Sequence, residues 1–206
     1  MIVEMRTYTL KPGSQATVIE RFGKALPVRQ KLSPLAAFWS TDVGPLNQII
    51  HVWCYADSAE RDKIRAASTK LEGWPPDIHE FVVDQETKIM IPAPFSPPLE
   101  PRTLGGIYEI RTYIYKPRSM PHVIESWSAA IGERTKLSPL VGAFYSEVGV
   151  LNQYVHIWAY KDAGERQRIR AEAVAKGIWP PKSKVADILV KQQNALCIPA
   201  PFSPLK

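Results

Sequence analysis

The sequence predicts an α+β fold in which two ferredoxin-like βαββαβ units pack sheet to sheet as an internal pseudo-dimer. Three observations lead to this prediction. The chain repeats itself, each copy has the element order of a split βαβ unit, and the strands of each copy carry one aliphatic face.

The repeat is visible at a constant offset of 105 residues, where Glu4–Tyr8 returns as Glu109–Tyr113. Over residues 4–76 and 109–181, 34 of the 73 aligned positions are identical. A match of this length indicates a duplicated domain rather than a shared composition. Two copies are too few for a solenoid, so we expect them to pack as a pair. The predicted organisation is a first unit at 1–97, a proline-rich linker at 98–104 and a second unit at 105–206.

Composition limits the class of protein. The 206 residues are 45% hydrophobic, which is enough for two small cores, and the net charge is +6. No apolar run approaches the roughly 20 residues that a membrane helix needs. Basic residues alternate with acidic ones, and no basic block stands out. We therefore expect a cytoplasmic protein with no membrane and no nucleic-acid partner.

The first half of each unit reads as strand, helix, strand and strand. Residues 2–9 alternate between two faces and are rich in β-branched and aromatic side chains, which is typical of a strand. Apolar residues then recur at helical spacing over 14–30, and we expect Pro27 to kink or end that helix. Residues 35–41 and 47–55 are two strands joined by a turn, which predicts a hairpin.

The second half of each unit adds a helix and a last strand. Asp57 and Glu60 have the spacing of a capping box, so a helix should run from there to about residue 70. Trp74-Pro75-Pro76 cannot continue it, and residues 81–91 form the last predicted strand. The second copy repeats this order with a two-residue insertion after Pro181.

A four-stranded sheet with both helices on one side leaves its other face uncovered. On the 47–55 strand that face carries aliphatic residues such as Ile50 and Val52, and the second copy has Val155 and Ile157 there. Burial of one aliphatic face on the other removes both from water. We therefore predict that these four residues meet between the sheets.

The opposite face of the same strand is aromatic and hydrogen-bonding, and it should point toward the helices. A cavity there would have apolar walls and a few polar groups, as ligand sites do. The 2–9 strand would contribute to it if it lies alongside. The predicted set is His51, Tyr55, His156 and Tyr160 as catalytic residues, with Arg6, Tyr8, Asn47, Trp53, Arg111, Tyr113, Asn152 and Trp158 as substrate-binding residues.

The two strand histidines also have a structural interpretation, and so do Arg61, Arg65 and Trp74. A strand histidine between Trp and Tyr is more often a hydrogen-bonded core residue than a catalytic one. Arg61 and Arg65 are neighbours on one helix face and need an acidic partner, which is either a carboxylate side chain or an anionic ligand. Trp74 is either a lid over a pocket or a side chain that fills the end of a core.

Several reaction classes have no support in the sequence. There is no glycine-rich phosphate loop, no GxSxG, no HExxH and no pair of cysteines at metal-ligand spacing. His51 has no companion His or Cys at such a spacing. We expect no metal and no cofactor.

The assembled pattern resembles the NIPSNAP family. The residues that carry the resemblance are Glu4-x-Arg6-x-Tyr8, Gly44-x-Leu46-Asn47, His51-x-Trp53-x-Tyr55, Arg61 and Arg65, each repeated 105 residues later. The resemblance implies the dimeric α+β barrel superfamily, so the fold expected is an internal pseudo-dimeric α+β barrel. Neighbouring families on that barrel include cofactor-independent monooxygenases, isomerases, polyketide cyclases and haem-binding proteins. Members of the family itself are linked to vesicle traffic and mitochondrial quality control.

Two functions follow from the sequence. The first is binding or transformation of a small, anionic or aromatic molecule, with the histidines as general acid or base, the tyrosines as donors and the arginines on an anionic oxygen. The second is a non-catalytic interaction module that uses the proline-rich tails, and a homo-oligomer of the pseudo-dimer is left open. The tails Ile91–Pro97 and Ile198–Pro204 should be ordered and dock across the pseudo-dimer, because Phe95 and Phe202 are costly to leave in water.

Overall fold

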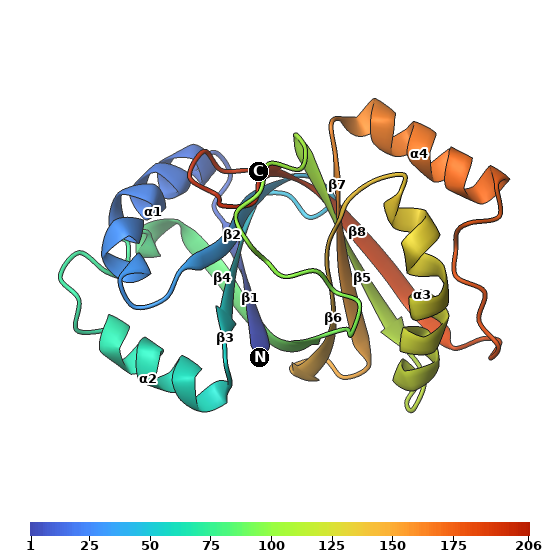
Figure 1. Cartoon of the computed structure of the whole chain (residues 1–206). Coiled ribbons are helices and arrows are strands. Elements are labelled where there is room, and N and C mark those ends of the chain that lie inside the picture. Colours follow the sequence, from blue (N-terminus) through green and yellow to red (C-terminus); the bar gives the residue numbers. More distant parts are fainter.

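Residues 1–206 are all described by the computed structural model, in which strands and helices form two equivalent halves (Figure 1). The element order of each half is the predicted one, with bounds that move by one to three residues. The elements are β1 (Ile2–Leu10), α1 (Gln15–Gln30), β2 (Leu35–Val43), β3 (Gln48–Tyr55), α2 (Ser58–Ser68), the 3-10 turn His79–Phe81, β4 (Val82–Pro92), β5 (Ile107–Tyr115), α3 (Met120–Thr135), β6 (Leu140–Val148), β7 (Gln153–Tyr160), α4 (Ala163–Ala175) and β8 (Leu189–Pro199).

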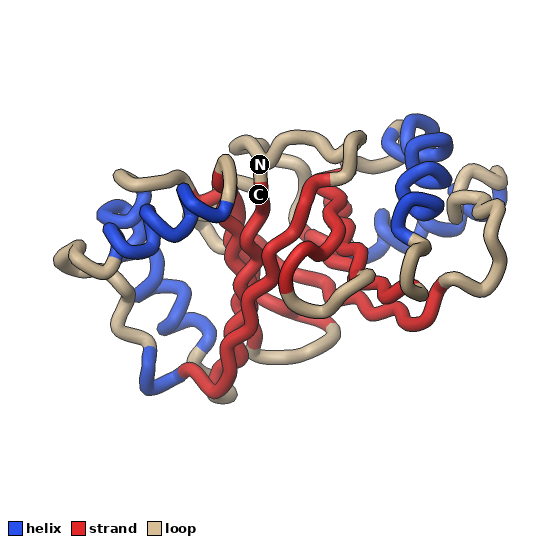
Figure 2. Tube along the Cα trace, turned by 90° about the horizontal axis from the view of Figure 1, so that it is seen from below, coloured by secondary structure: helices blue, strands red, loops and turns tan.

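The eight strands close into one antiparallel barrel in the order β1-β3-β2-β8-β5-β7-β6-β4. The last strand of each unit pairs with the first strand of its own unit and with a hairpin strand of the other, β4 with β6 and β8 with β2. The two sheets are thus joined by hydrogen bonds at both edges. Figure 2 shows the strands at the centre and the helices outside them at both ends. The predicted α+β barrel is confirmed.

Helix boundaries follow local chemistry with one exception. Asp57 begins α2 by accepting a hydrogen bond from the Glu60 backbone N–H at 2.9 Å, as the sequence predicts. Pro27 does not end α1, which continues to Gln30. Leu26 and Arg29 on either side of the proline are both buried, and helices in proteins are held mainly by such packing. None of the helices is long and apolar enough to cross a membrane.

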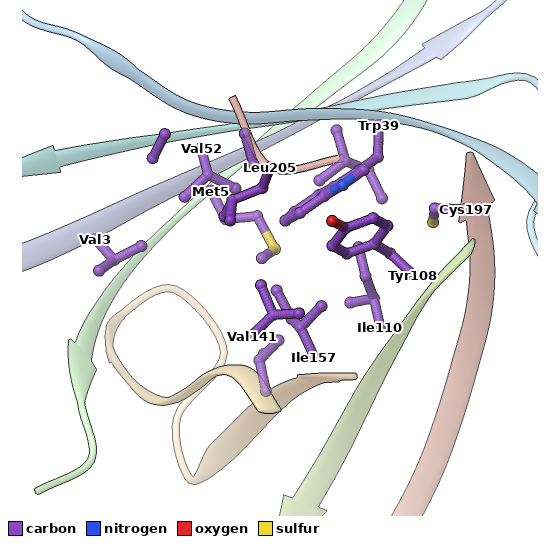
Figure 3. Packing of buried hydrophobic residues seen from close by; sticks show 14 of the residues in the cluster. Val3, Met5, Trp39, Val52, Tyr108, Ile110, Val141, Ile157, Cys197 and Leu205 are labelled. Carbon is purple, nitrogen blue, oxygen red and sulfur yellow. The ribbon is translucent and has the colours of Figure 1, made fainter. Parts of the chain in front are cut away.

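The barrel interior holds the largest core cluster, with side chains from both units (Figure 3). Ile50 and Val52 share this cluster with Val155 and Ile157, so the predicted contact between the aliphatic faces is confirmed. Two smaller clusters lie between the sheet and the helices of each unit. The polar-aromatic strand faces point into these two outer layers, as predicted.

The proline-rich tails cross from one unit to the other. Phe95 of the first unit stacks on Trp127 of the second, with ring centroids 6.3 Å apart. In the other direction, Phe202 meets Phe38 at 4.9 Å, and the Ala200 backbone N–H donates to the Phe38 carbonyl at 3.0 Å. The prediction that the tails dock across the pseudo-dimer is confirmed. The two proline-rich tails therefore pack within the chain. The hypothesis of an interaction module depended on these tails.

Candidate functional site

Strand pairing places the predicted residues of the first unit together. β1 and β3 lie side by side in an antiparallel register in which Arg6 is opposite His51 and Glu4 is opposite Trp53. Residues two apart share a strand face, so all four side chains point from the barrel toward α1 and α2. The condition that the sequence left open, adjacency of these two strands, is met.

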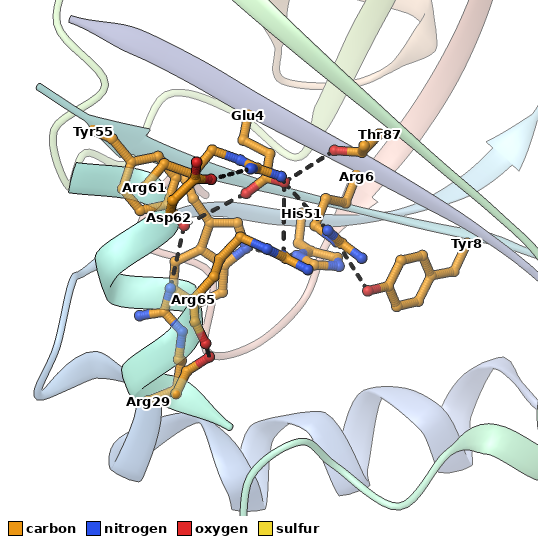
Figure 4. Close-up of polar contacts among 12 residues, drawn as sticks. Glu4, Arg6, Tyr8, Arg29, His51, Tyr55, Arg61, Asp62, Arg65 and Thr87 are labelled. Atoms are coloured by element: carbon orange, nitrogen blue, oxygen red, sulfur yellow. Dashed lines mark hydrogen bonds and ion pairs between the residues drawn. The ribbon is translucent and has the colours of Figure 1, made fainter. Parts of the chain in front are cut away.

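Glu4 is the centre of an ion cluster that Figure 4 shows between β1 and α2. Its fully buried carboxylate lies 2.7 Å from Arg61, 3.2 Å from Arg6 and 3.8 Å from Arg65, and Thr87 donates to it at 3.1 Å. Burial by itself would raise the pKa of Glu4, but the hydrogen bond from Arg61 and the arginine charges outweigh it and hold the pKa below its ordinary value. Of the two partners predicted for the α2 arginines, the carboxylate side chain is present.

A further arginine joins the cluster from α1. Arg29 is buried and donates to Tyr55 Oη at 3.2 Å and to Ser33 Oγ at 2.9 Å. Its guanidinium lies 4.4 Å from the centroid of the Trp53 ring, a cation–π contact. Together with the three arginines around Glu4, Arg29 gives this layer more positive than negative charge. A site with such a surplus favours anions.

His51 has one ring nitrogen in use and one free. Trp53 Nε1–H, which can only donate, lies 2.7 Å from His51 Nδ1, so the neutral imidazole carries its proton on Nε2. Nε2 is buried and has no hydrogen-bond partner. Burial, followed by the charges of Arg6, Arg29 and Arg65, lowers the pKa of His51 well below its usual value. His51 is therefore a neutral hydrogen-bond donor.

His51 is one of the residues that line a pocket of about 660 Å³ between the sheet and the helices. Its size is within the usual range for small-molecule sites. Five of the six residues predicted for this unit line it, and the cluster arginines Arg29 and Arg65 do so as well. The polar residues of its wall are Glu4, Arg6, Tyr8, Arg29, His51, Tyr55, Arg65, Ser68, Thr69, His79, Asp84 and Gln85.

The second unit repeats the polar contacts but not the pocket. Glu109 meets Arg166 at 2.6 Å and Arg111 at 2.7 Å, and Trp158 donates to His156 Nδ1 at 2.8 Å. The cavity of this unit is about 380 Å³, and neither an arginine nor a histidine lines it. Among the residues predicted for this unit, only Tyr113 is in its wall.

Six of the predicted residues line neither cavity, namely Asn47 and, in the second unit, Arg111, Asn152, His156, Trp158 and Tyr160. Asn47 and Asn152 sit at the hairpin turns with φ of 57° and 56°, where asparagine tolerates the left-handed backbone better than most residues do. Their carbonyls accept hydrogen bonds from the Leu10 and Tyr115 backbones.

Arg29 was missed because an arginine near the end of a helix normally faces solvent. Its recurrence at position 134 is the signal that could have found it.

Comparison with known proteins assigns the chain to a family. The NIPSNAP family model matches it twice, at residues 3–97 and 108–204. The chain belongs to the NIPSNAP family. Human NipSnap homolog 3B is 32% identical over 213 residues, covering 98% of this chain and 85% of the human protein. The NipSnap homolog of Dictyostelium discoideum is 29% identical over 182 residues, covering 86% and 78% respectively.

Solved structures extend the likeness to the fold of the whole NIPSNAP chain. A structure from Lactobacillus acidophilus superposes with a TM-score of 0.68 at 7% identity, covering 97% of this chain and 93% of that one. An anthrone oxidase-like protein superposes with a TM-score of 0.61 at 8% identity, covering 96% and 90%. At such identities the likeness shows the fold alone.

The buried histidines of this NIPSNAP protein make its stability depend on pH. Burial and neighbouring arginines also lower the pKa of His156 well below its usual value. In the unfolded chain each histidine takes up a proton as the pH falls through about 6.5, while in the folded chain it stays neutral. Stability is therefore lost as the pH falls, by up to about 1.4 kcal/mol per pH unit for each histidine below pH 6.5. Urea denaturation at pH 7, 6 and 5 measures this slope.

A double variant tests the origin of that slope. With His51→Asn and His156→Asn, whose amide oxygens can still accept from the two tryptophans, most of the slope between pH 7 and 5 should disappear. His79→Gln, at an exposed position, should leave it unchanged. An equal slope in the double variant and the unmodified protein would contradict the assignment.

Proposed function

We propose that the first NIPSNAP unit binds a small organic anion with an aromatic or similarly bulky apolar body. The observation that carries this proposal is that His51, whose buried Nε2–H has no hydrogen-bond partner, is a lining residue of the pocket together with Arg6. A buried donor without an acceptor costs about 1–3 kcal/mol. An anionic oxygen in the pocket would remove that cost and would also meet the surplus arginine charge.

The polar end of the pocket supports a particular orientation of the anion. Arg6 Nε donates to Tyr8 Oη at 3.0 Å and one of its Nη atoms meets Glu4, so its guanidinium is held in place. Arg65 is 44% exposed and 3.8 Å from Glu4, which makes it the least committed arginine of the cluster. We place the anionic oxygens between Arg6, Arg65 and His51 Nε2–H, where charge-assisted hydrogen bonds are strongest.

The rest of the wall suits an apolar body. The indoles of Trp53 and Trp74 meet edge to face at 6.3 Å, and Phe22 meets Trp74 at 5.4 Å. These rings offer both faces and edges to an aromatic or flat aliphatic group. The apolar wall is formed by Phe22, Trp53, Trp74, Pro75, Ile78 and Val82.

The same donors define what chemistry the site would support. His51 Nδ1 already accepts from Trp53, so its role in this proposal is that of a donor and not of a general base. Two donors aimed at one oxygen stabilise negative charge that develops there during a reaction. This is the role we propose for His51 and Arg6 if the bound molecule is transformed. Tyr55, bonded to Arg29 and 3.5 Å from Glu4, would position the cluster.

A matched pair of probes tests the proposal. Titration of 2-naphthoate and of its neutral counterpart 2-naphthamide can be followed by calorimetry and by the fluorescence of Trp53 and Trp74, which line the pocket. We expect the carboxylate to bind at least tenfold more tightly than the amide, because only the carboxylate pairs with the arginines. Arg6→Met should weaken 2-naphthoate binding at least tenfold.

The control is Arg168→Met, which removes an exposed arginine from α4 and should leave affinity unchanged. Melting temperatures of both variants separate loss of the site from loss of the fold. Equal affinity for the acid and the amide, or an Arg6→Met variant that is folded and binds as before, would refute the anion site.

A further inference from the structure

We infer that the chain binds one organic anion and not two, because Trp127 closes the second unit's copy of the site. This inference rests on the function proposed above, and it concerns which of two nearly identical residue sets can be reached by a ligand.

The second unit has kept the polar machinery. His156 Nε2, like His51 Nε2, is buried without a hydrogen-bond partner, and Glu109 is surrounded by Arg111, Arg166 and Arg170. Loss of polar residues on the strands therefore does not distinguish the two units. The difference must lie in what covers these residues.

The cover is an aromatic side chain on α3. At the position of Phe22 in the first unit, the second unit has Trp127. The Trp127 ring lies 4.5 Å from His156 and 4.6 Å from Trp179. The equivalent Phe22 distances, to His51 and Trp74, are 5.1 and 5.4 Å. The larger indole thus lies closer to both the histidine and the tryptophan of its unit than Phe22 does.

A second aromatic substitution supports the first. Tyr154 replaces Ile49, and its ring packs 4.8 Å from Trp127 and 5.7 Å from His156. Trp127, which comes from α3, is thereby held against His156 by a ring from β7 as well. Both Trp127 and Tyr154 are buried, at 4% and 0% exposure.

The shape and lining of the two cavities agree with this closure. The first pocket reaches Arg6, Arg29, Arg65 and His51, whereas the second stops at Trp127 and is about 280 Å³ smaller, at 380 against 660 Å³. No positively charged side chain lines the second cavity.

An independent sequence difference points the same way. Ser68 and Thr69 line the first pocket at the end of α2. The second unit has Ala173 and Val174 at these positions, so both hydroxyl groups are absent there. The end of α4 in the second unit therefore lacks the polar groups that the end of α2 contributes to the first pocket.

The stoichiometry of 2-naphthoate binding to the full chain tests the inference. We expect 1 equivalent per chain, removed by Arg6→Met. Phe22→Trp should narrow the first pocket as Trp127 narrows the second, and weaken binding at least tenfold. Trp127→Phe combined with Tyr154→Ile should open the second site and raise the stoichiometry to 2. Circular dichroism and melting temperature establish that each variant is folded.

The outcomes separate this inference from the proposed function. Two equivalents in the unmodified protein would overturn the closure of the second site and leave anion binding in place. No binding of 2-naphthoate or other arylcarboxylates by the unmodified protein would overturn the proposed function itself. A folded Trp127→Phe/Tyr154→Ile variant that still binds only one equivalent would show that these two rings do not close the site. If that variant does not fold, Phe22→Trp with undiminished binding is the refuting result.

Discussion

Deletion of residues 200–206 is expected to lower the free energy of unfolding by about 4–6 kcal/mol, the largest effect we predict. Leu205 is completely buried in the barrel interior, and Ala200 is buried against the first unit. Burial of a leucine or phenylalanine side chain contributes about 1.5–3 kcal/mol when complete, and Phe202 adds a part of that. The deletion also removes the hydrogen bond between Ser203 Oγ and the Phe38 backbone N–H.

Urea denaturation measures this loss, and the variant Lys206→Ala is the control because the Lys206 side chain is exposed. The control should unfold at the same urea concentration as the unmodified protein. A truncated chain with an unchanged unfolding midpoint would mean that the cross-docked tail does not stabilise the barrel.

The second large effect is expected from Glu4→Gln. This change leaves the shape of the side chain but removes the one carboxylate that Arg6, Arg61 and Arg65 share, while Arg61 keeps its contact with Asp62. Loss of one partner from a buried ion pair typically costs about 3–5 kcal/mol, because the remaining charge is uncompensated. We expect about 3 kcal/mol, the lower end, since Arg65 is partly exposed to water.

Glu20→Gln is the matched control, because Glu20 forms an exposed ion pair with Lys24 on α1. Exposed pairs contribute little, so this variant should unfold like the unmodified protein. If Glu4→Gln and Glu20→Gln had equal stability, Glu4 could not be the charge that holds the cluster together.

Much of the fold could be predicted because its signals are local or repeated. The Asp57 cap and the alternation around His51 depend only on residues near in sequence, and the recurrence of Glu4–Tyr8 as Glu109–Tyr113 is a direct repeat. The family resemblance implied a barrel, but the residues themselves did not show that β4 joins β6, since Ile91 and Pro92 would look the same in a stacked sheet and in a closed barrel. The effect of Pro27 was mispredicted for a related reason. The packing that stabilises α1 beyond Pro27 involves residues distant in sequence.

The site shows the same division. Strand alternation placed Arg6, His51 and Trp53 on one face, and the structure brings them together. The same alternation placed Asn47 on the face of His51, but Asn47 lies in the turn, where the backbone leaves the strand conformation. The substitution of Trp127 for Phe22 is visible in the sequence, but the direction of the indole depends on Tyr154 and Trp179, which come from other elements.

The covalent joining of the two halves has a genetic consequence. In a homodimeric barrel each codon specifies the same residue in both sites, so a substitution that closes one site also closes the other. Here β2–β8 and β4–β6 complete the barrel within one chain, and positions 22 and 127 are inherited separately. One copy is free to drift while the other remains under selection. The barrel also closes at a high effective concentration set by the linker, so its melting temperature should not change on dilution.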